Sequence, residues 1–453
     1  MREGRVPFGP TYDEMLNAET IDQAVRRKAL VALQEDEMDP INLFNITWKD
    51  AHNAVRKVVL PQEFTGVDAN IVVLLGNGFP SGSHKVGPAY ATLMEGCVDG
   101  DIVPGVHTIL GPSTGNFGIG VAYICSLMGF EAVVIMPDNM SKERYDRIQR
   151  YGARLDLTPG TESDVILTLQ RTFELKKDPK NRSLAQFELM ANYRFHRHVT
   201  GNSAVEAVKG IGNGRVACFI SAPGSAGTLA AGDCLKDAFP ECRVVALEPY
   251  ECATLSTGGR GQHRIEGIGD KMCTLIHNVL TTDFVALIHD DDCVKALKII
   301  EEGHRILVGM GVKEAVARGM KGLFGVSGMC NIIGAIKMAK YLRLGAGENL
   351  VTVATDGMDR YHSVVEDLEN RYLEVEEFVL ERWARDIFLK ATEDHIFDFR
   401  SSQAKEALYA QKEKDWLPFG YAKGYLDSMR SPDFWESEYE KVRHYDERIE
   451  RMR

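Results

Sequence analysis

The sequence has no surplus of positive charge and no long apolar run. Its 453 residues carry 53 Lys and Arg against 65 Asp and Glu, a formal net charge of −12. Neither end holds a basic block that could follow a phosphate backbone, so nucleic acid is not expected as a partner. No apolar stretch approaches the ~20 residues of a membrane span, and the first residues lack the apolar core of a signal peptide. We therefore expect a cytoplasmic protein without a membrane partner.

Ordered cysteine spacing and nucleotide-binding motifs are missing as well. The nine Cys are an odd number without a CxxC pair, so we expect buried, reduced thiols rather than a disulfide framework, and no metal site. The Walker pattern GxxxxGK[ST] is absent, and no GxGxxG motif occurs in a strand–turn–helix unit. These absences disfavour NTP hydrolysis and simple NAD chemistry.

The middle of the chain alternates short β-branched runs with longer helix-period segments. Six runs are typical of buried parallel strands: 71–75, 106–110, 132–136, 216–220, 244–247 and 351–354. The helical patterns between and after them are 87–97, 118–128, 142–151, 202–209, 227–238, 294–308 and 331–342. This alternation predicts an α/β protein with open sheets covered by helices on both faces. Ligands bind such sheets outside the carboxyl ends of the strands.

Composition divides the chain into four segments. We expect an N-terminal extension at 1–49, a first α/β domain at 50–200, a second at 201–362 and a helical extension at 363–453. The last segment has few Gly, many charges and no strand-like run, and its apolar residues recur at helical steps. It also carries three of the four Trp, which a disordered tail would not normally hold. We expect it to fold over the core or against a second subunit.

The 42 Gly gather in turns that join strands to helices. The first such turn lies within residues 79–88 and leads to Lys85 at the start of a helix. A single Lys in that position is usually only a surface charge. The second turn, 111–122, places Ser113, Thr114, Gly115 and Asn116 at a helix start, where backbone N–H groups and the helix dipole suit a carboxylate or phosphate. A simple N-capped turn, with Ser113 or Thr114 as the cap, explains this second segment equally well.

A third Gly-rich turn, 221–228, again joins a strand to a helix. Its residues Gly224, Ser225, Ala226, Gly227 and Thr228 could hold a phosphate through main-chain N–H groups, with two hydroxyls as further donors. The three turns together offer one Lys, one carboxylate-binding loop and one phosphate cup. A lysine imine to a phosphorylated aldehyde cofactor, pyridoxal 5'-phosphate (PLP), fits all three.

In order and context these segments resemble the fold-type II PLP enzymes, which include cysteine synthase, cystathionine β-synthase, threonine synthase and the tryptophan synthase β chain. The resemblance covers roughly residues 75–363 and implies their two-domain, tryptophan synthase β-like fold. It places Lys85, in Ser81-Gly-Ser-His-Lys, on the lysine that forms the Schiff base and removes the substrate Cα proton. The other site residues that it implies are Asn116 at the cofactor's phenolic oxygen, Ser113, Thr114, Gly115 and Gln186 at the substrate carboxylate, Gly224 to Thr228 at the phosphate, and Ser327 at the pyridine nitrogen.

The resemblance implies a lyase or transferase of amino-acid metabolism. We expect cysteine synthase-like β-elimination or β-replacement, through an aminoacrylate, on an amino acid with a leaving group at Cβ, in a homodimer. A threonine synthase-like or dehydratase-like lyase acting on a hydroxy-amino acid is the alternative. A second alternative is a PLP-binding subunit with little activity alone, because Gly111 stands where the family keeps a Glu. Arg144 and Arg360 are interpreted as surface or loop ion pairs rather than substrate clamps.

Overall fold

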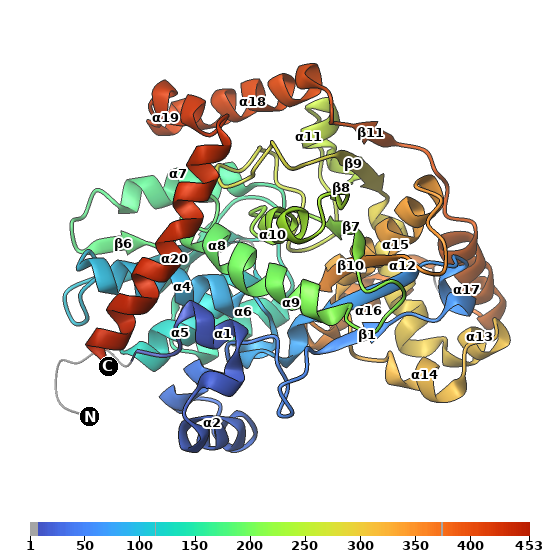
Figure 1. The fold of residues 1–453 in the computed structure, drawn as a ribbon, viewed down its shortest axis with the longest axis horizontal. Helices are drawn as coiled ribbons and strands as arrows, with labels where there is room; N and C mark the ends of the chain where they lie inside the picture. The colour runs from blue at the N-terminus through green and yellow to red at the C-terminus, as the bar shows by residue number, and fades with distance from the viewer. Residues whose placement is uncertain (1–7, 114, 373–374) are drawn as a thin grey trace.

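The structure is a computed structural model that describes residues 8–113, 115–372 and 375–453. Its strands form two open sheets and its helices cover both (Figure 1). The strands are β1 (Lys57–Val59), β2 (Asn70–Leu75), β3 (Thr108–Pro112), β4 (Ala132–Pro137), β5 (Arg154–Thr158), β6 (Asn181–Ser183), β7 (Val216–Ser221), β8 (Arg243–Pro249), β9 (Phe284–Ile288), β10 (Asn349–Ala354) and β11 (Ile396–Asp398). All six strands predicted from the sequence are among them.

The α-helices follow the same alternation. They are α1 (Tyr12–Leu16), α2 (Gln23–Glu35), α3 (Gln62–Thr65), α4 (Val86–Asp99), α5 (Asn116–Met128), α6 (Lys142–Arg150), α7 (Val165–Leu175), α8 (Met190–Phe195), α9 (Gly201–Ala207), α10 (Ala231–Ala238), α11 (Thr254–Thr257), α12 (Asp290–Glu302), α13 (His304–Gly309), α14 (Glu314–Gly319), α15 (Val326–Tyr341), α16 (His362–Tyr372), α17 (Glu377–Ala384), α18 (Ser402–Trp416), α19 (Lys423–Ser428) and α20 (Pro432–Met452). The single helix predicted over 294–308 is wrong in one respect, because the helix ends before Gly303 and restarts as α13.

The larger sheet has seven strands in the order β1-β2-β10-β7-β8-β9-β11. Its five central strands run parallel, and β1 and β11 pair antiparallel at the two edges. The smaller sheet, β5-β4-β3-β6, is entirely parallel. The domain boundaries at 49, 200 and 362 stay predictions, and the larger sheet crosses them, since it takes β1 and β2 from before residue 200 and β11 from after residue 362.

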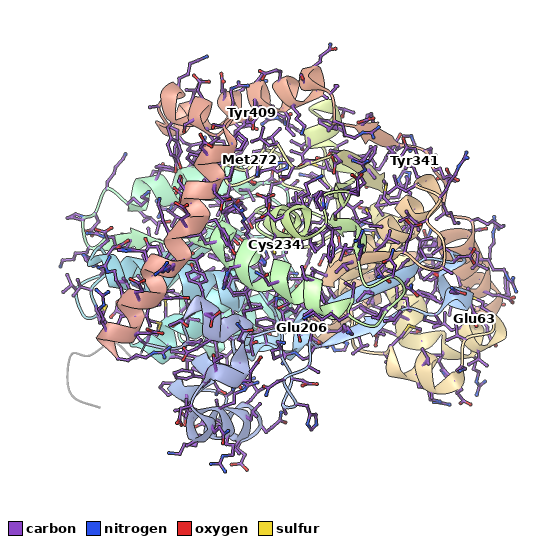
Figure 2. The ribbon with its side chains drawn as sticks, viewed as in Figure 1. Glu63, Glu206, Cys234, Met272, Tyr341 and Tyr409 are labelled. Carbon is purple, nitrogen blue, oxygen red and sulfur yellow. The ribbon has the colours of Figure 1, made fainter. Side chains whose placement is uncertain are left out.

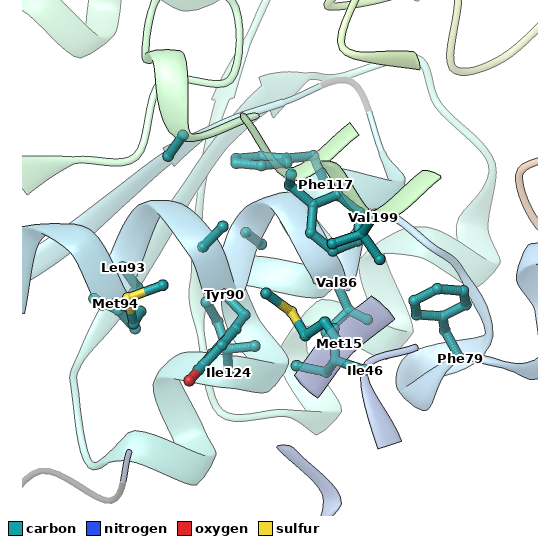
Figure 3. Packing of buried hydrophobic residues seen from close by; sticks show 14 of the residues in the cluster. Met15, Ile46, Phe79, Val86, Tyr90, Leu93, Met94, Phe117, Ile124 and Val199 are labelled. Atoms are coloured by element: carbon teal, nitrogen blue, oxygen red, sulfur yellow. The ribbon is translucent and has the colours of Figure 1, made fainter. Parts of the chain in front are cut away.

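Two helices that begin at the candidate site pack tightly against each other. A Cβ at Gly120 of α5 would lie 3.1 Å from the Val86 Cα and 3.2 Å from the Lys85 carbonyl oxygen, so a larger residue would push the two backbones apart by a few tenths of an ångström. Figure 3 shows the surrounding apolar cluster, in which Val86 and Tyr90 of α4 lie near Phe117 of α5. The close packing fixes the start of α4 relative to the start of α5.

The segment after residue 362 folds over the core, as expected, but it is not entirely helical. The expectation of no strand there is wrong, because β11 pairs with β9 through Ile396 opposite Ala286. A three-residue edge strand is defined by its partner rather than by its own pattern, so its sequence carries little signal. Helix α20 runs back along the core (Figure 1), where Tyr445 donates to Asp99 at 2.9 Å and Asp446 accepts from the Tyr12 amide at 2.7 Å.

Two further expectations can be compared with the described residues. All nine Cys are buried free thiols. Within the described ranges, no helix combines the length and apolarity needed to cross a bilayer.

Candidate active site

Lys85 lies directly before α4, after a tight turn in which Ser81 and Gly82 take positive φ values of 59° and 72°. It is buried, with 8% of its surface exposed, and its Nζ lies 3.4 Å from the Ser225 hydroxyl. Burial lowers the pKa of Lys85 to about 8, although Asp270 and Glu162 favour the charged form. Lys85 is therefore a buried amine with a reactive neutral form near neutral pH, not a surface charge.

The loop between β3 and α5 is held by Ser113. Its hydroxyl accepts from the amides of Gly115 and Gly118, each at 2.9 Å, although the N-cap position of α5 is Gly115 and not Ser113. Thr114 lies outside the described residues. Asn116 donates from Nδ2 to Asp356 at 2.5 Å, and its buried Oδ1 has no hydrogen-bond partner among the described residues.

The turn after β7 leaves no room for a side chain at either of its two glycines. A Cβ at Gly224 would lie 2.6 Å from the Gly267 carbonyl oxygen, and one at Gly227 would lie 2.2 Å from Asn192 Oδ1. Ala226 takes a positive φ of 66°. Thr228, which begins a 3-10 turn leading into α10, lies with its hydroxyl 2.7 Å from that of Ser221. This geometry brings backbone close to any occupant and suits an anion.

Asn192 connects two of the predicted site residues. Its Nδ2 donates to the backbone carbonyl of Gln186 and to the Ser225 hydroxyl, both at 2.9 Å. Gln186 is itself buried, with 5% of its surface exposed. The predicted carboxylate ligand Gln186 and the cup residue Ser225 are thus held next to each other, and Lys85 Nζ lies 3.4 Å from the same Ser225 hydroxyl.

Asp356, just after β10, contacts the segment before Lys85, the predicted residue Asn116 and the start of α15, which carries the predicted residue Ser327. Ser83 forms a β-bridge with Asp356, the residue that binds Asn116. The first turn of α15 approaches the same carboxylate, since a Cβ at Gly325 would lie 2.1 Å from Asp356 Oδ1. Ser327 follows in this turn, buried, with a hydroxyl that has no partner within the described residues.

The interpretation of Arg144 as a surface or loop ion pair is wrong about the surface, but the ion pair with a loop residue is present. Its side chain is fully buried, with Nε 2.8 Å from Glu266 and Nη2 donating to the Tyr361 hydroxyl at 3.1 Å. Burial disfavours the cation, but Glu266, Tyr361 and Glu162 together raise the pKa of Arg144. A Cβ at Gly115 would collide with its guanidinium, so Arg144 covers the carboxylate loop.

Arg360 is likewise not at the surface, although it does form an ion pair, with Asp359 at 3.3 Å. This side chain is 1% exposed and donates to the carbonyl oxygens of Ser81 and Gly82, the latter at 2.9 Å. Burial lowers the pKa of Arg360. Its contacts fix the turn that delivers Lys85, so Arg360 has a positioning role that its sequence neighbourhood alone did not indicate.

Asp270 is a site residue without any motif. It is 6% exposed, and its Oδ2 has no hydrogen-bond partner among the described residues. Burial raises the pKa of Asp270 to about 7, opposed by Lys85. The segment that carries it closes over the cup, because Gly269 donates to the Pro223 carbonyl at 3.0 Å and Thr274 donates to the Ser225 carbonyl at 2.9 Å.

A polar cleft of about 350 Å³ is lined by two carboxylates, Glu162 and Glu266, that contact Arg144. It lies between α6, α16 and the loop that carries Glu266, and its lining includes Ser141, Glu162, His263 and Ser363. Ser141 donates to Glu266 from its amide and its hydroxyl, at 3.2 and 3.1 Å. The Glu266 and Glu162 side chains thus line the cleft on one side and contact Arg144 on the other.

The chain matches the family model "Pyridoxal-phosphate dependent enzyme" over residues 58–356. It is 34% identical to the cysteine synthase of Staphylococcus aureus over 296 residues, which are 65% of this chain and 88% of that protein. It is 33% identical to a probable cysteine synthase of Bacillus subtilis over 232 residues, 51% of this chain and 74% of that protein.

The solved structures give a consistent result. The chain resembles O-acetylserine sulfhydrylase isoform 3 from Entamoeba histolytica, with a TM-score of 0.61, 27% identity, and coverage of 74% of this chain and 93% of that one. It also resembles an O-acetylserine-dependent cystathionine β-synthase from Helicobacter pylori, with a TM-score of 0.58, 25% identity, and coverage of 68% and 94%.

This chain belongs to the family of pyridoxal-phosphate dependent enzymes. It is an α/β enzyme of the fold-type II class, and the activity predicted from the sequence, PLP-dependent elimination or replacement at Cβ of an amino acid, is confirmed. The site fits the cofactor: a buried amine, a turn whose glycines admit no side chain, and unpartnered polar atoms on Asn116 and Ser327 among the described residues.

Proposed function

We propose that this enzyme carries out a cysteine synthase-like β-replacement on an amino acid with a leaving group at Cβ. The observation that carries the proposal is the buried Lys85 amine, which lies against the Ser225 hydroxyl of the phosphate cup. PLP, when bound, withdraws electrons from the substrate Cα and so allows the Cβ leaving group to depart. The roles below are those of the protein's own residues.

Lys85 holds the cofactor and then removes the substrate Cα proton. Its neutral form is accessible because burial lowers the pKa of Lys85 to about 8, which is close to the operating range that general base catalysis requires. Asp270, whose unpartnered Oδ2 lies in the same buried site of the described chain, keeps a negative charge beside the ammonium when Lys85 has taken up the proton.

Four sets of residues would position the reactants. Backbone N–H groups of Gly224 to Thr228 bind the cofactor phosphate at the start of a helix. Ser113, Gly115 and Gln186 orient the substrate carboxylate, together with Thr114 as expected from the sequence. Ser327 offers a neutral hydroxyl to the ring nitrogen, which suits elimination without a fully protonated ring. Asn116, which is fixed by Asp356, would bind the cofactor's phenolic oxygen.

Arg144 protects the reaction from water on the substrate side. It lies over the Gly115 loop and is held by Glu266 and Tyr361, so a fixed guanidinium covers this side of the site. A closed, preorganised site of this kind strengthens the electrostatic interactions inside it.

Product analysis of the purified chain tests this proposal. With O-acetylserine and sulfide we expect cysteine and acetate in equal amounts, and with O-acetylserine alone a slower release of pyruvate. Serine, O-phosphoserine and threonine serve as matched substrates that differ in the leaving group or in the β-methyl group. Rapid formation of 2-oxobutanoate from threonine without thiol products would contradict β-replacement in favour of the lyase alternative. A chain that binds cofactor but turns over none of them would contradict it in favour of the subunit alternative.

The reactivity of Lys85 gives a pH prediction. In cofactor-free protein, we expect the rate of covalent PLP attachment to rise with pH through about 8, because only the neutral amine attacks the aldehyde. Asp270→Asn removes a carboxylate that stabilises the ammonium, so the midpoint should move to lower pH. Stopped-flow absorbance between roughly pH 6 and 10, a range that includes the midpoint and approaches the ordinary Lys pKa, measures it. Asp398→Asn, at an exposed pair with Arg400, is the control; an unchanged or higher midpoint for Asp270→Asn would refute the assignment.

We also propose that the enzyme is a cytoplasmic homodimer that takes a small amino-acid substrate. The α/β core resembles O-acetylserine-using enzymes over most of their length, which supports the substrate class. The assembly and the location stay predictions.

A further inference from the structure

The wall that closes the candidate site is an irregular segment. Residues 258–283 contain no helix or strand, so their backbone groups are not paired in a ladder and need partners from elsewhere. The inner side of this segment contacts the site at three places: Glu266 pairs with Arg144, Asp270 lies beside Lys85, and Thr274 donates to the Ser225 carbonyl. The position of the segment therefore affects both ends of the site.

The outer side of the same segment is held by α18 of the C-terminal extension. Lys412 Nζ donates to the carbonyl oxygens of Leu275 and His277, at 3.0 and 2.6 Å. Trp416 donates from Nε1 to the Cys273 carbonyl at 2.7 Å. These contacts lie directly on either side of Thr274, the residue that reaches the cup.

Asp415 extends this contact to the beginning of the wall. One of its oxygens accepts from the Cys273 amide at 2.8 Å, and the other accepts from Arg260 at 2.6 Å. Lys412, Asp415 and Trp416 are spaced three and four residues apart or adjacent, so they share one face of α18. Figure 2 labels Tyr409 of α18 and, below it in this view, Met272 of the segment.

A buried Lys at position 412 is unexpected if the side chain serves only to fill space. It is 1% exposed, its hydrogen bonds within the described chain go to neutral carbonyls, and the Trp435 ring lies 5.6 Å away. Burial lowers the pKa of Lys412 to about 8. An apolar residue of similar volume would avoid the desolvation cost of a buried ammonium, whereas only a donor can fix the carbonyls of Leu275 and His277.

We propose that α18 is part of the active site's framework: Lys412, with Asp415 and Trp416, positions the 273–277 backbone so that Thr274 and Asp270 meet the phosphate cup and Lys85. The family match ends at residue 356, so this support comes from a part of the chain outside the shared catalytic core. Lys412 is a positioning residue, since it contacts the wall and not the reacting atoms. The proposal rests on the proposed function for its cofactor readout.

The test compares Lys412→Met with Lys405→Met in the full-length enzyme. Lys405 lies on the same helix and donates to the Leu280 carbonyl of the same segment, away from Thr274, so it controls for a lost lysine-to-carbonyl bond. We expect Lys412→Met to weaken PLP binding at least about tenfold, a change of ~1.4 kcal/mol, and to shift the visible absorption of the bound cofactor. Lys405→Met should change neither. Lys412→Arg, which keeps the donors, should restore much of the binding.

A second readout does not depend on the cofactor. In cofactor-free protein, hydrogen exchange at the Cys273 and Leu275 amides should accelerate in Lys412→Met and in Trp416→Phe, which removes the indole donor. Equal loss of cofactor affinity in Lys412→Met and Lys405→Met, or native affinity together with native exchange in Lys412→Met, would overturn the proposal. If the native chain itself bound no PLP, the proposed function would fail, and the exchange measurement alone would still decide the role of α18.

Discussion

Replacement of Lys85 by alanine is expected to lower kcat by a factor of about 10³ or more, because the same side chain attaches the cofactor and moves the Cα proton, and a general base alone contributes about 10²–10⁴. The amine is buried against Ser225, and Asp270 is the acidic neighbour with the largest effect on its pKa. No second lysine contacts Ser225 or Asp270 among the described interactions. The cofactor should therefore bind without a covalent link, and the visible absorption band of the native enzyme should be lost.

The measurement combines the absorption spectrum with steady-state rates of β-replacement. Lys57→Ala is the matched control, since Lys57 is also a partly buried lysine, donating to the Ala207 carbonyl at 2.5 Å away from the site. A Lys85→Ala protein that keeps both the absorption band and more than a few per cent of the native rate would refute the assignment of Lys85.

Replacement of Gly227 by alanine is expected to remove most of the affinity for PLP. The added Cβ would lie 2.2 Å from Asn192 Oδ1 and 2.8 Å from the His196 ring, and both neighbours are buried. Overpacking of this kind costs about 1–3 kcal/mol, and here the strain displaces Asn192, which holds Ser225 and the Gln186 carbonyl. We expect the Kd for PLP to rise at least about tenfold, at ~1.4 kcal/mol per factor of ten.

Equilibrium titration of cofactor-free protein with PLP measures the effect of Gly227→Ala. Gly319→Ala is the control, because Gly319 ends α14 without a positive φ and no described heavy atom lies within 4 Å of the place its Cβ would take. The control should bind PLP as the native protein does. Native affinity in Gly227→Ala, with the protein folded, would show that the turn after β7 is not the phosphate cup.

The parts of the site that the sequence predicts correctly are those encoded by a continuous stretch. Lys85 and the turn from Gly224 to Thr228 each follow a strand and open a helix, so local pattern places their backbone before any tertiary contact is known. The structure then brings these separate turns together, with Lys85 Nζ 3.4 Å from Ser225. Their roles as cofactor ligands remain predictions that the two substitutions above test.

The residues that the sequence did not reveal act across long separations. Arg144 meets Tyr361 and Glu266, and Asp270 lies beside Lys85, and none of these pairs is close in the chain. One signal was available for Arg144: it shares a face of α6 with the buried Ile148, which is an inward position for a cation. Asp270 had no such signal, since it lies in a segment without regular structure.

The strands that were predicted, too, have a strong sequence pattern of their own, and two short strands that were missed depend on pairing with distant segments. The six predicted strands are long or rich in β-branched residues, whereas β6 and β11 have three residues each and depend on pairing with β3 and β9. The helical extension was recognisable from its charge pattern and its Trp residues. Its contact with the active-site wall was not, because Lys412 is an ordinary charge in the sequence and becomes a buried donor only in the folded chain.

The central claim is that Lys85-linked PLP in this chain supports loss of a Cβ leaving group followed by addition of a nucleophile. The most direct measurement is a spectral titration of the purified native enzyme with O-acetylserine, with alanine as the substrate analogue that has no leaving group. We predict that O-acetylserine replaces the resting absorption band by a new one, that sulfide restores the resting band with stoichiometric cysteine, and that alanine does not produce the new band. Identical spectra with O-acetylserine and alanine, or a new band that sulfide does not reverse, would contradict the account.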